Sequence, residues 1–171
     1  MSLRYLFFNL CLLPITLIAQ DVPPIEGVII EKEVLKEFAP DFEMTMADGT
    51  KKKLSDFQGE VLYLSFWASW CKPCISGFNK YRPMREDMEK LGVVMLNVSV
   101  DKSPEKWKSA IAEHQPTGIH AHVSQDLVRD SYQLYSVPLY EIVGKRGQFL
   151  YLSDDPDRNI LDNFRAFLAE E

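Results

Sequence analysis

Cysteine is scarce in this chain of 171 residues, which contains three. So few cysteines exclude a dense disulfide scaffold, and a chain of this length can form one domain around a hydrophobic core of ordinary size. Because three is an odd number, the first question is which of the cysteines belong together.

The chain also lacks an excess of positive charge, because 19 Lys and Arg residues face 25 Asp and Glu residues, for a net charge of −6. A nucleic-acid-binding protein needs a basic face, so this balance argues against a nucleic-acid partner. With 46% hydrophobic and 26% charged residues, the chain fits neither a disordered protein nor one with several membrane spans. It contains no internal repeat and no low-complexity segment.

The N-terminal residues 1–20 differ in composition from the rest of the chain. Arg4 is their only charged side chain, and a mostly apolar run leads to the small residue Ala19. This pattern is typical of a secretory signal peptide, cleaved after Ala19 or Gln20, and predicts export to the periplasm or cell envelope. The alternative is an uncleaved N-terminal membrane anchor, although the run is shorter than the roughly 20 residues of a spanning helix. Cleavage would remove Cys11 and leave two cysteines in an oxidising compartment.

Hydrophobic periodicity after the leader, residues 21–37, predicts alternating strands and helices. A β-hairpin comes first, with Asp48 and Gly49 at its turn, and a second hairpin follows near the C-terminus. The expected strands are 42–46, 50–53, 61–67, 93–100, 119–123, 139–143 and 148–152, and the expected helices are 72–90 (kinked at Pro83), 104–114, 126–134 and 159–169. This order predicts an α/β protein whose central mixed β-sheet is flanked by helices.

A Cys-x-x-Cys motif stands where a buried strand passes into a helix. The N-terminus of a helix carries about half a positive charge, which stabilises a thiolate there. Cys71 is therefore expected to be exposed at the helix start as the attacking sulfur, and Cys74, one turn further in, to be the resolving sulfur. Lys72 adds positive charge, and Pro73 suits the first helical turn. We expect the pKa of the Cys71 thiol to lie below the value of about 8.5 for a free cysteine.

Two other interpretations of the cysteine pair involve no exchange chemistry. The pair could join two of the residues His114, His120 and His122 in a zinc site, but the spacing matches no usual zinc pattern. The pair could also be an inert structural disulfide, but a loop this short constrains the unfolded chain little.

The motifs in their order resemble thioredoxin-fold proteins of the envelope TlpA/ResA-like group of thiol–disulfide oxidoreductases, within the redoxin/AhpC-TSA-like superfamily. The resemblance runs from residue 38 to the C-terminus. It rests on four segments: residues 39–59 at the first hairpin, Phe-Trp-Ala-Ser-Trp-Cys-Lys-Pro-Cys at 66–74, Val-Ser-Val-Asp at 98–101, and Tyr-Gln-Leu-Tyr-Ser-Val-Pro at 132–138. A bare Cys-x-x-Cys is a weak signal, whereas the complete series is specific.

The resemblance implies a thioredoxin-like domain over residues 38–171, with the first hairpin as an N-terminal extension. Its catalytic residues would be Cys71 and Cys74, whose redox-active disulfide would be the only cofactor, with no metal. Pro138 would be a cis-proline, and the backbone of the preceding residue would pair with a substrate strand. The implied substrate-binding residues are Trp70, Lys72, Pro73, Val137 and Pro138.

Two carboxylates of the related proteins are missing here. Ser65 stands where thioredoxins carry a buried Asp, and Gly77 stands where envelope relatives often carry a Glu. Such a group helps the resolving cysteine to lose its proton. Glu141 either faces the site as a substitute proton acceptor or is an exposed carboxylate on an edge strand.

The resemblance also implies partners: client proteins with cysteines or disulfides, among them apocytochrome thiols, and a membrane electron donor that keeps a monomeric enzyme reduced. One alternative is a thioredoxin-fold copper(I) chaperone, whose cysteines are usually separated by three residues rather than two. Another is a peroxidase, which would need a Thr where this chain has Ala68. The direction of exchange depends on the reduction potential and not on the motif.

Overall fold

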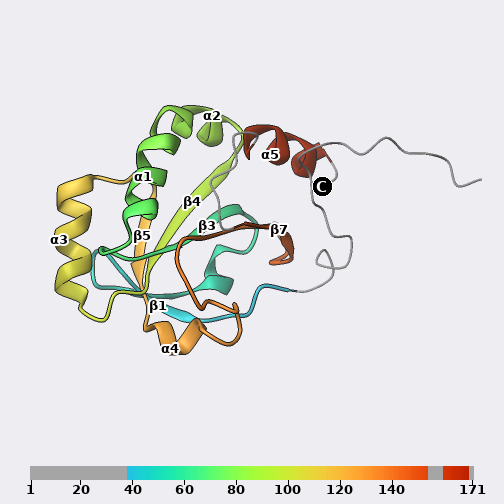
Figure 1. Cartoon of the computed structure of the whole chain (residues 1–171). Helices are drawn as coiled ribbons and strands as arrows, with labels where there is room; N and C mark the ends of the chain where they lie inside the picture. The colour runs from blue at the N-terminus through green and yellow to red at the C-terminus, as the bar shows by residue number, and fades with distance from the viewer. Residues whose placement is uncertain (1–37, 154–159, 170–171) are drawn as a thin grey trace, which may run out of the picture.

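The computed structural model describes residues 38–153 and 160–169 (Figure 1). The predicted signal peptide (residues 1–20), the leader (residues 21–37) and position 159 lie outside the described residues. In the described part of the chain, no helix is both long and apolar enough to cross a membrane.

A single mixed sheet of seven strands organises the fold, in the order β2-β1-β5-β4-β3-β6-β7. β3, β4 and β5 are parallel to one another, whereas β1, β6 and β7 join in antiparallel pairs. The strands are β1 (Glu43–Met46), β2 (Lys51–Lys53), β3 (Val61–Trp67), β4 (Val93–Ser99), β5 (Ile119–His122), β6 (Leu139–Val143) and β7 (Phe149–Ser153). The predicted α/β class is confirmed, and the first hairpin extends the sheet by pairing with β5.

The strands β3 and β4 form the centre of the sheet because their sequences are apolar without interruption. Every residue of β3 is buried, as is nearly all of β4, since side chains cover both faces. The register pairs Val61 with Val93 and Trp67 with Ser99, so the carboxyl ends of the two strands lie side by side. The chain leaves β3 at this edge and enters the Cys-x-x-Cys segment.

The helices are α1 (Lys72–Tyr81), η3 (Arg82–Met84), α2 (Arg85–Lys90), α3 (Pro104–His114), α4 (Gln125–Val128) and α5 (Ile160–Ala169), and η2 (Leu54–Phe57) is a short 3-10 turn. α1, α2 and α5 lie above the sheet in Figure 1, and α4 lies below it. The predicted helix 72–90 is interrupted at Pro83, as expected, because proline lacks the N–H that an α-helix needs.

The predicted helix 126–134 is too long. α4 ends at Val128, and the chain then turns, with Gln133 in the left-handed region at φ 48° and the Leu134 amide bonded to the Arg129 carbonyl at 2.8 Å. The apolar residues Tyr132 and Leu134 are both buried beyond the helix end, which is why they mimic helical spacing in the sequence.

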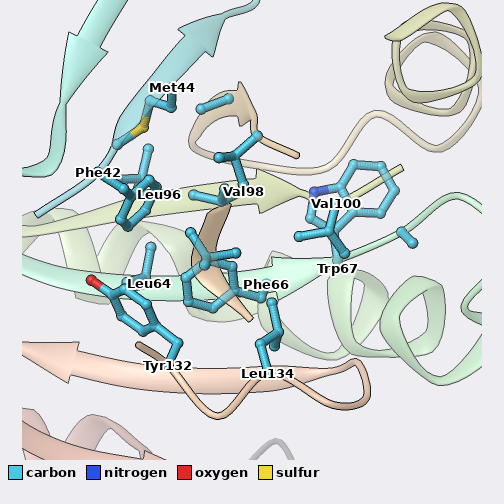
Figure 2. Close-up of a cluster of buried hydrophobic side chains, with 14 of the residues drawn as sticks. Phe42, Met44, Leu64, Phe66, Trp67, Leu96, Val98, Val100, Tyr132 and Leu134 are labelled. Atoms are coloured by element: carbon cyan, nitrogen blue, oxygen red, sulfur yellow. The ribbon is translucent and has the colours of Figure 1, made fainter. Parts of the chain in front are cut away.

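Two clusters of buried side chains hold the layers together. One joins β3 to the helices above it through Tyr63, Tyr81 and Phe164, with ring centroids 5.2 and 6.0 Å from that of Tyr63. The larger cluster contains both cysteines of the motif. Figure 2 shows part of it, with side chains from β1, β3, β4 and the segment after α4. The site therefore rests directly on the main core.

Candidate redox site

The cysteine pair lies at the N-terminus of α1. Cys71 is the residue that caps the helix, and its Sγ accepts a hydrogen bond from the Cys74 amide at 3.2 Å. The two residues form a disulfide with Cα atoms 5.3 Å apart. Pro73 stands in the first turn, where no N–H is needed. Backbone N–H groups and the helix dipole thus point toward Cys71, as the sequence predicts.

The predicted exposure of Cys71 is wrong for the disulfide form. Cys71 is 3% exposed and Cys74 is 1% exposed. The reason is that both belong to the main core cluster, against which the partly buried Val137 also packs. Around them, Trp70 is 65% exposed, and Lys72 and Pro73 are exposed as well. The side chains that flank the pair are therefore accessible to solvent, whereas the two cysteines are not.

The second predicted segment of the site is the loop before β6. The peptide bond between Val137 and Pro138 is cis, which confirms the expected cis-proline. Both residues are partly buried, and the exposed side chain of Tyr135 precedes them. The Arg129 guanidinium lies over the Tyr135 ring, 5.8 Å from its centroid. An exposed aromatic ring thus precedes the cis-proline, and Val137 packs against the core cluster that contains the disulfide.

Asp101, just after β4, lies next to the turn before the cysteine pair, in a position for which the sequence predicts no role. Its carboxylate is 2% exposed and accepts hydrogen bonds from the Ser69 amide at 2.8 Å, the Ser69 hydroxyl at 2.7 Å and the Ser99 hydroxyl at 2.9 Å. Ser69 is two residues before Cys71. The only signal in the sequence is the Val-Ser-Val-Asp segment at 98–101, because the contact joins residues 32 positions apart.

Glu141 is buried, so the interpretation as an exposed edge-strand carboxylate is wrong. It is 2% exposed, because β6 lies between β3 and β7 and both faces of the sheet are covered. Burial raises the pKa of its carboxyl well above the usual range. Its Oε2 atom has no hydrogen-bond partner. A carboxyl in this setting favours its protonated form at pH values where an exposed one is ionised.

Strand pairing determines which face of the sheet Glu141 occupies. Glu141 pairs with Leu64, and Tyr140 pairs with Ser65. Side chains alternate along a strand, so Glu141 lies on the opposite face from Ser65, the position of the missing Asp. Leu64 and Val143 belong to the core cluster that contains both cysteines, and Leu139 packs against it.

The histidines add no ligand to the cysteine pair. The His120 Nε2 atom lies 3.1 Å from the Pro116 carbonyl oxygen, and the His122 Nε2 atom lies 2.7 Å from the Asp101 carbonyl oxygen. Burial lowers the pKa of His120. Within residues 38–153 and 160–169, no three His, Cys, Asp or Glu side chains form a group that could hold a metal ion.

A central mixed sheet, a disulfide at the start of a helix and a cis-proline before the next strand together define a protein of the thioredoxin-like class. The comparison with protein families agrees with this class: residues 35–170 match the AhpC/TSA family, and the chain belongs to that family. The resemblance recognised in the sequence is thereby confirmed.

Individual relatives agree with this assignment. The chain is 32% identical to the thiol-disulfide oxidoreductase ResA of Geobacillus kaustophilus over 113 residues, which cover 64% of this chain and 63% of ResA. It is 29% identical to the thioredoxin-like protein YneN of Bacillus subtilis over 110 residues, which cover 64% of this chain and 65% of YneN. In both cases the match spans less than two thirds of the relative's length.

The fold also matches a solved structure. The thioredoxin domain of a thiol-disulfide oxidoreductase from Bacteroides vulgatus aligns with a TM-score of 0.69 at 22% identity, and the alignment covers 77% of this chain and 96% of that domain. At this identity the match concerns the fold alone.

Proposed function

We propose that this protein is a thiol–disulfide oxidoreductase that reduces disulfides in client proteins. The observation that supports the proposal best is the Cys71–Cys74 disulfide at the N-terminus of α1, with the Cys74 amide directed at the Cys71 sulfur. The names of the relatives, thiol-disulfide oxidoreductase ResA among them, point to the same reaction.

The proposed reaction begins from the dithiol form. The Cys71 thiolate attacks one sulfur of a client disulfide, which forms a mixed disulfide and releases the other client sulfur as a thiolate. The Cys74 thiolate then attacks the Cys71 sulfur, which releases the second client thiolate. The client gains two electrons and, after protonation, two protons, and the protein ends as the Cys71–Cys74 disulfide.

The resolving step needs a group that removes the proton of the Cys74 thiol, and we propose Glu141. It is buried, has an unbonded Oε2 atom, and pairs with Leu64, which belongs to the cluster that contains both cysteines. Because burial raises its pKa, Glu141 can accept a proton at a higher pH than an exposed carboxylate. Its strand pairing distinguishes it from the carboxylate that thioredoxins carry at the position of Ser65.

The surroundings of the reaction are also part of the proposal. Residues 1–20 would direct the chain to the periplasm or cell envelope, or anchor it there. A membrane electron donor would return the disulfide to the dithiol, and proteins with accessible cysteines would be the clients. Trp70, Lys72, Pro73 and the backbone at Val137 and Pro138 would contact the client.

Replacement of the cysteines one at a time tests the reaction. In Cys74→Ser, the mixed disulfide with the client cannot be resolved, so a covalent complex should accumulate and disappear on treatment with dithiothreitol. In Cys71→Ser, reduction of insulin disulfides by the purified protein should fall to the background rate. Cys11→Ser, made in the uncleaved chain that still contains this residue, is the matched control and should retain the wild-type rate, because Cys11 is outside the pair.

Two other results would overturn the proposal. Peroxide turnover that survives Cys74→Ser, without insulin reduction, would identify a peroxidase. Stoichiometric Cu(I) binding by the wild type, lost on replacement of a histidine and without disulfide exchange, would identify the copper chaperone.

A further inference from the structure

The carboxylate of Asp101 accepts hydrogen bonds from the turn that leads into the disulfide. The Cys71 amide donates to the Ala68 carbonyl at 3.0 Å, which closes the turn over residues 68–71. Inside this turn, Ser69 gives both its amide and its hydroxyl to Asp101. The adjoining ends of the central strands are joined as well, because the Val100 amide donates to the Trp67 carbonyl at 2.9 Å. Figure 2 shows these two residues side by side.

The hydrogen bonds around Asp101 are those of an ionised carboxylate. Oδ2 accepts from the Ser69 amide and the Ser99 hydroxyl, Oδ1 lies 2.7 Å from the Ser69 hydroxyl, and the Asp101 amide donates to the Ser99 hydroxyl at 3.1 Å. Among the ion pairs formed by the described residues, none includes Asp101. The charge is thus satisfied by dipoles and is not neutralised by a cation.

We propose that Asp101 is a positioning residue of the redox site, which fixes the turn before Cys71 and, through its buried negative charge, favours the disulfide over the dithiol. The inference rests on the proposed function. Nearby buried charges interact strongly because little water screens them. The Asp101 carboxylate is hydrogen-bonded to Ser69, two residues before Cys71, and its negative charge opposes the thiolate that the helix N-terminus favours. The dithiol form, which contains this thiolate, is then a stronger reductant.

His122 lies next to the hydrogen bonds that surround the Asp101 carboxylate. His122 approaches the Asp101 carbonyl oxygen at 2.7 Å, and its ring stacks on Trp107 with centroids 5.3 Å apart. These contacts engage the backbone of Asp101 and leave its carboxylate to the two serines. The neighbouring Lys102 is exposed and contributes no ion pair within the described residues.

The experiment compares Asp101→Asn with wild type in glutathione redox buffers. Asn has nearly the same shape but no charge, so the equilibrium constant should move about tenfold toward the dithiol, which corresponds to a reduction potential about 30 mV less negative. The pH midpoint of Cys71 alkylation by iodoacetamide should fall in the same variant, because the thiolate is no longer opposed. A purely structural role would weaken folding without moving the potential in this direction.

Two further variants make the result decisive. Asp87→Asn removes an equally negative but exposed charge on α2, which is paired with Lys90, and should leave the equilibrium constant within about twofold of wild type, because water and salt screen an exposed charge. Ser69→Ala keeps the Asp101 charge but removes one hydrogen bond, so it should slow exchange without a shift toward the dithiol. This second variant tests the charge even if Asp101→Asn folds poorly.

The outcomes separate the inference from the proposed function. If the wild type exchanges with glutathione and Asp101→Asn has the same equilibrium constant as Asp87→Asn, the role of Asp101 is overturned and the enzyme remains. A shift toward the dithiol in Ser69→Ala would likewise overturn the argument from charge. If the wild type does not exchange at all, the proposed function fails, and this inference fails with it.

Discussion

Two carboxylates flank the strand that carries the site, and they are buried to the same extent. Asp101 follows β4 and Glu141 lies in β6, on either side of β3, and each is 2% exposed. Asp101 accepts three hydrogen bonds, whereas the Oε2 atom of Glu141 has no partner and burial raises the pKa of its carboxyl. Burial alone therefore does not decide the charge of a carboxylate. The hydrogen-bond donors around a carboxylate decide its charge as well. Asp101 is therefore suited to keep a fixed negative charge, and Glu141 is suited to accept and release a proton.

The largest effect is expected for Asp101→Ala. The substitution removes the acceptor of three hydrogen bonds and leaves buried N–H and O–H donors unsatisfied, so the free energy of unfolding should fall by about 3 kcal/mol. Urea unfolding measures the change. Asp87→Ala is the control and should lie within about 0.5 kcal/mol of wild type, because its carboxylate is on the surface. Equal losses of unfolding free energy in the two variants would show that the hydrogen bonds of Asp101 do not stabilise the fold more than a surface carboxylate does.

Glu141→Gln should change how stability depends on pH. The raised folded-state pKa means that the folded protein keeps a proton that the unfolded chain releases above about pH 4.3. The free energy of unfolding of the wild type should therefore fall as pH rises from there, by up to about 1.4 kcal/mol per pH unit, until the folded-state pKa is reached. Gln does not titrate, so the variant should lack this loss. Urea unfolding between about pH 4 and pH 7 compares the two proteins.

The same variant also tests Glu141 as the proton acceptor. In the wild type, the rate of the resolving step should contain a rise with pH that follows ionisation of Glu141, and Glu141→Gln should lack this rise. The exposed Glu60 offers the control, because Glu60→Gln should match the wild type in both measurements. If the rate of the resolving step depended on pH in the same way in wild type and Glu141→Gln, Glu141 would not be the proton acceptor.

The smallest effect is expected for Tyr132→Phe. Burial, with a smaller contribution from the charge of Glu141, raises the pKa of the Tyr132 hydroxyl, and this hydroxyl donates to the Pro40 carbonyl at 2.6 Å. Loss of one such hydrogen bond should lower the free energy of unfolding by about 1 kcal/mol. Tyr135→Phe, at an exposed ring, should have no measurable effect. A change in the pH dependence of unfolding in Tyr132→Phe would show that this tyrosine also controls the proton on Glu141.

Much of the fold could be predicted because its signals are local. The apolar run of β3 and the Ser103–Pro104 start of α3 each depend on neighbouring residues, and the predicted bounds 61–67 and 104–114 agree with the structure. The end of α4 could not be predicted in this way. Its apolar residues continue at helical spacing, but they are buried by contacts with the rest of the core, such as that of Tyr132 with Phe66, whose ring centroids are 5.0 Å apart.

The residues of the site also separate into those with a local signal in the sequence and those that depend on long-range contacts. The cysteine pair, the helix that follows it and the cis-proline were predicted from short motifs, and the structure contains the disulfide and the cis peptide bond. The burial of Cys71, the environment of Glu141 and the role of Asp101 were not predicted. Each depends on which strands lie next to one another, and sequence spacing does not contain that information.

The sequence by itself therefore determined the position of the cysteine pair, because a Cys-x-x-Cys motif at the start of a helix is specified by a few adjacent residues. Only the tertiary structure decided the electrostatic setting of that pair. It brings Ser69 and Ser99 to the carboxylate of Asp101 and leaves Glu141 Oε2 without a donor. The reason is physical: the energy of a buried charge depends on the dipoles within hydrogen-bond distance, and folding brings these from distant parts of the chain.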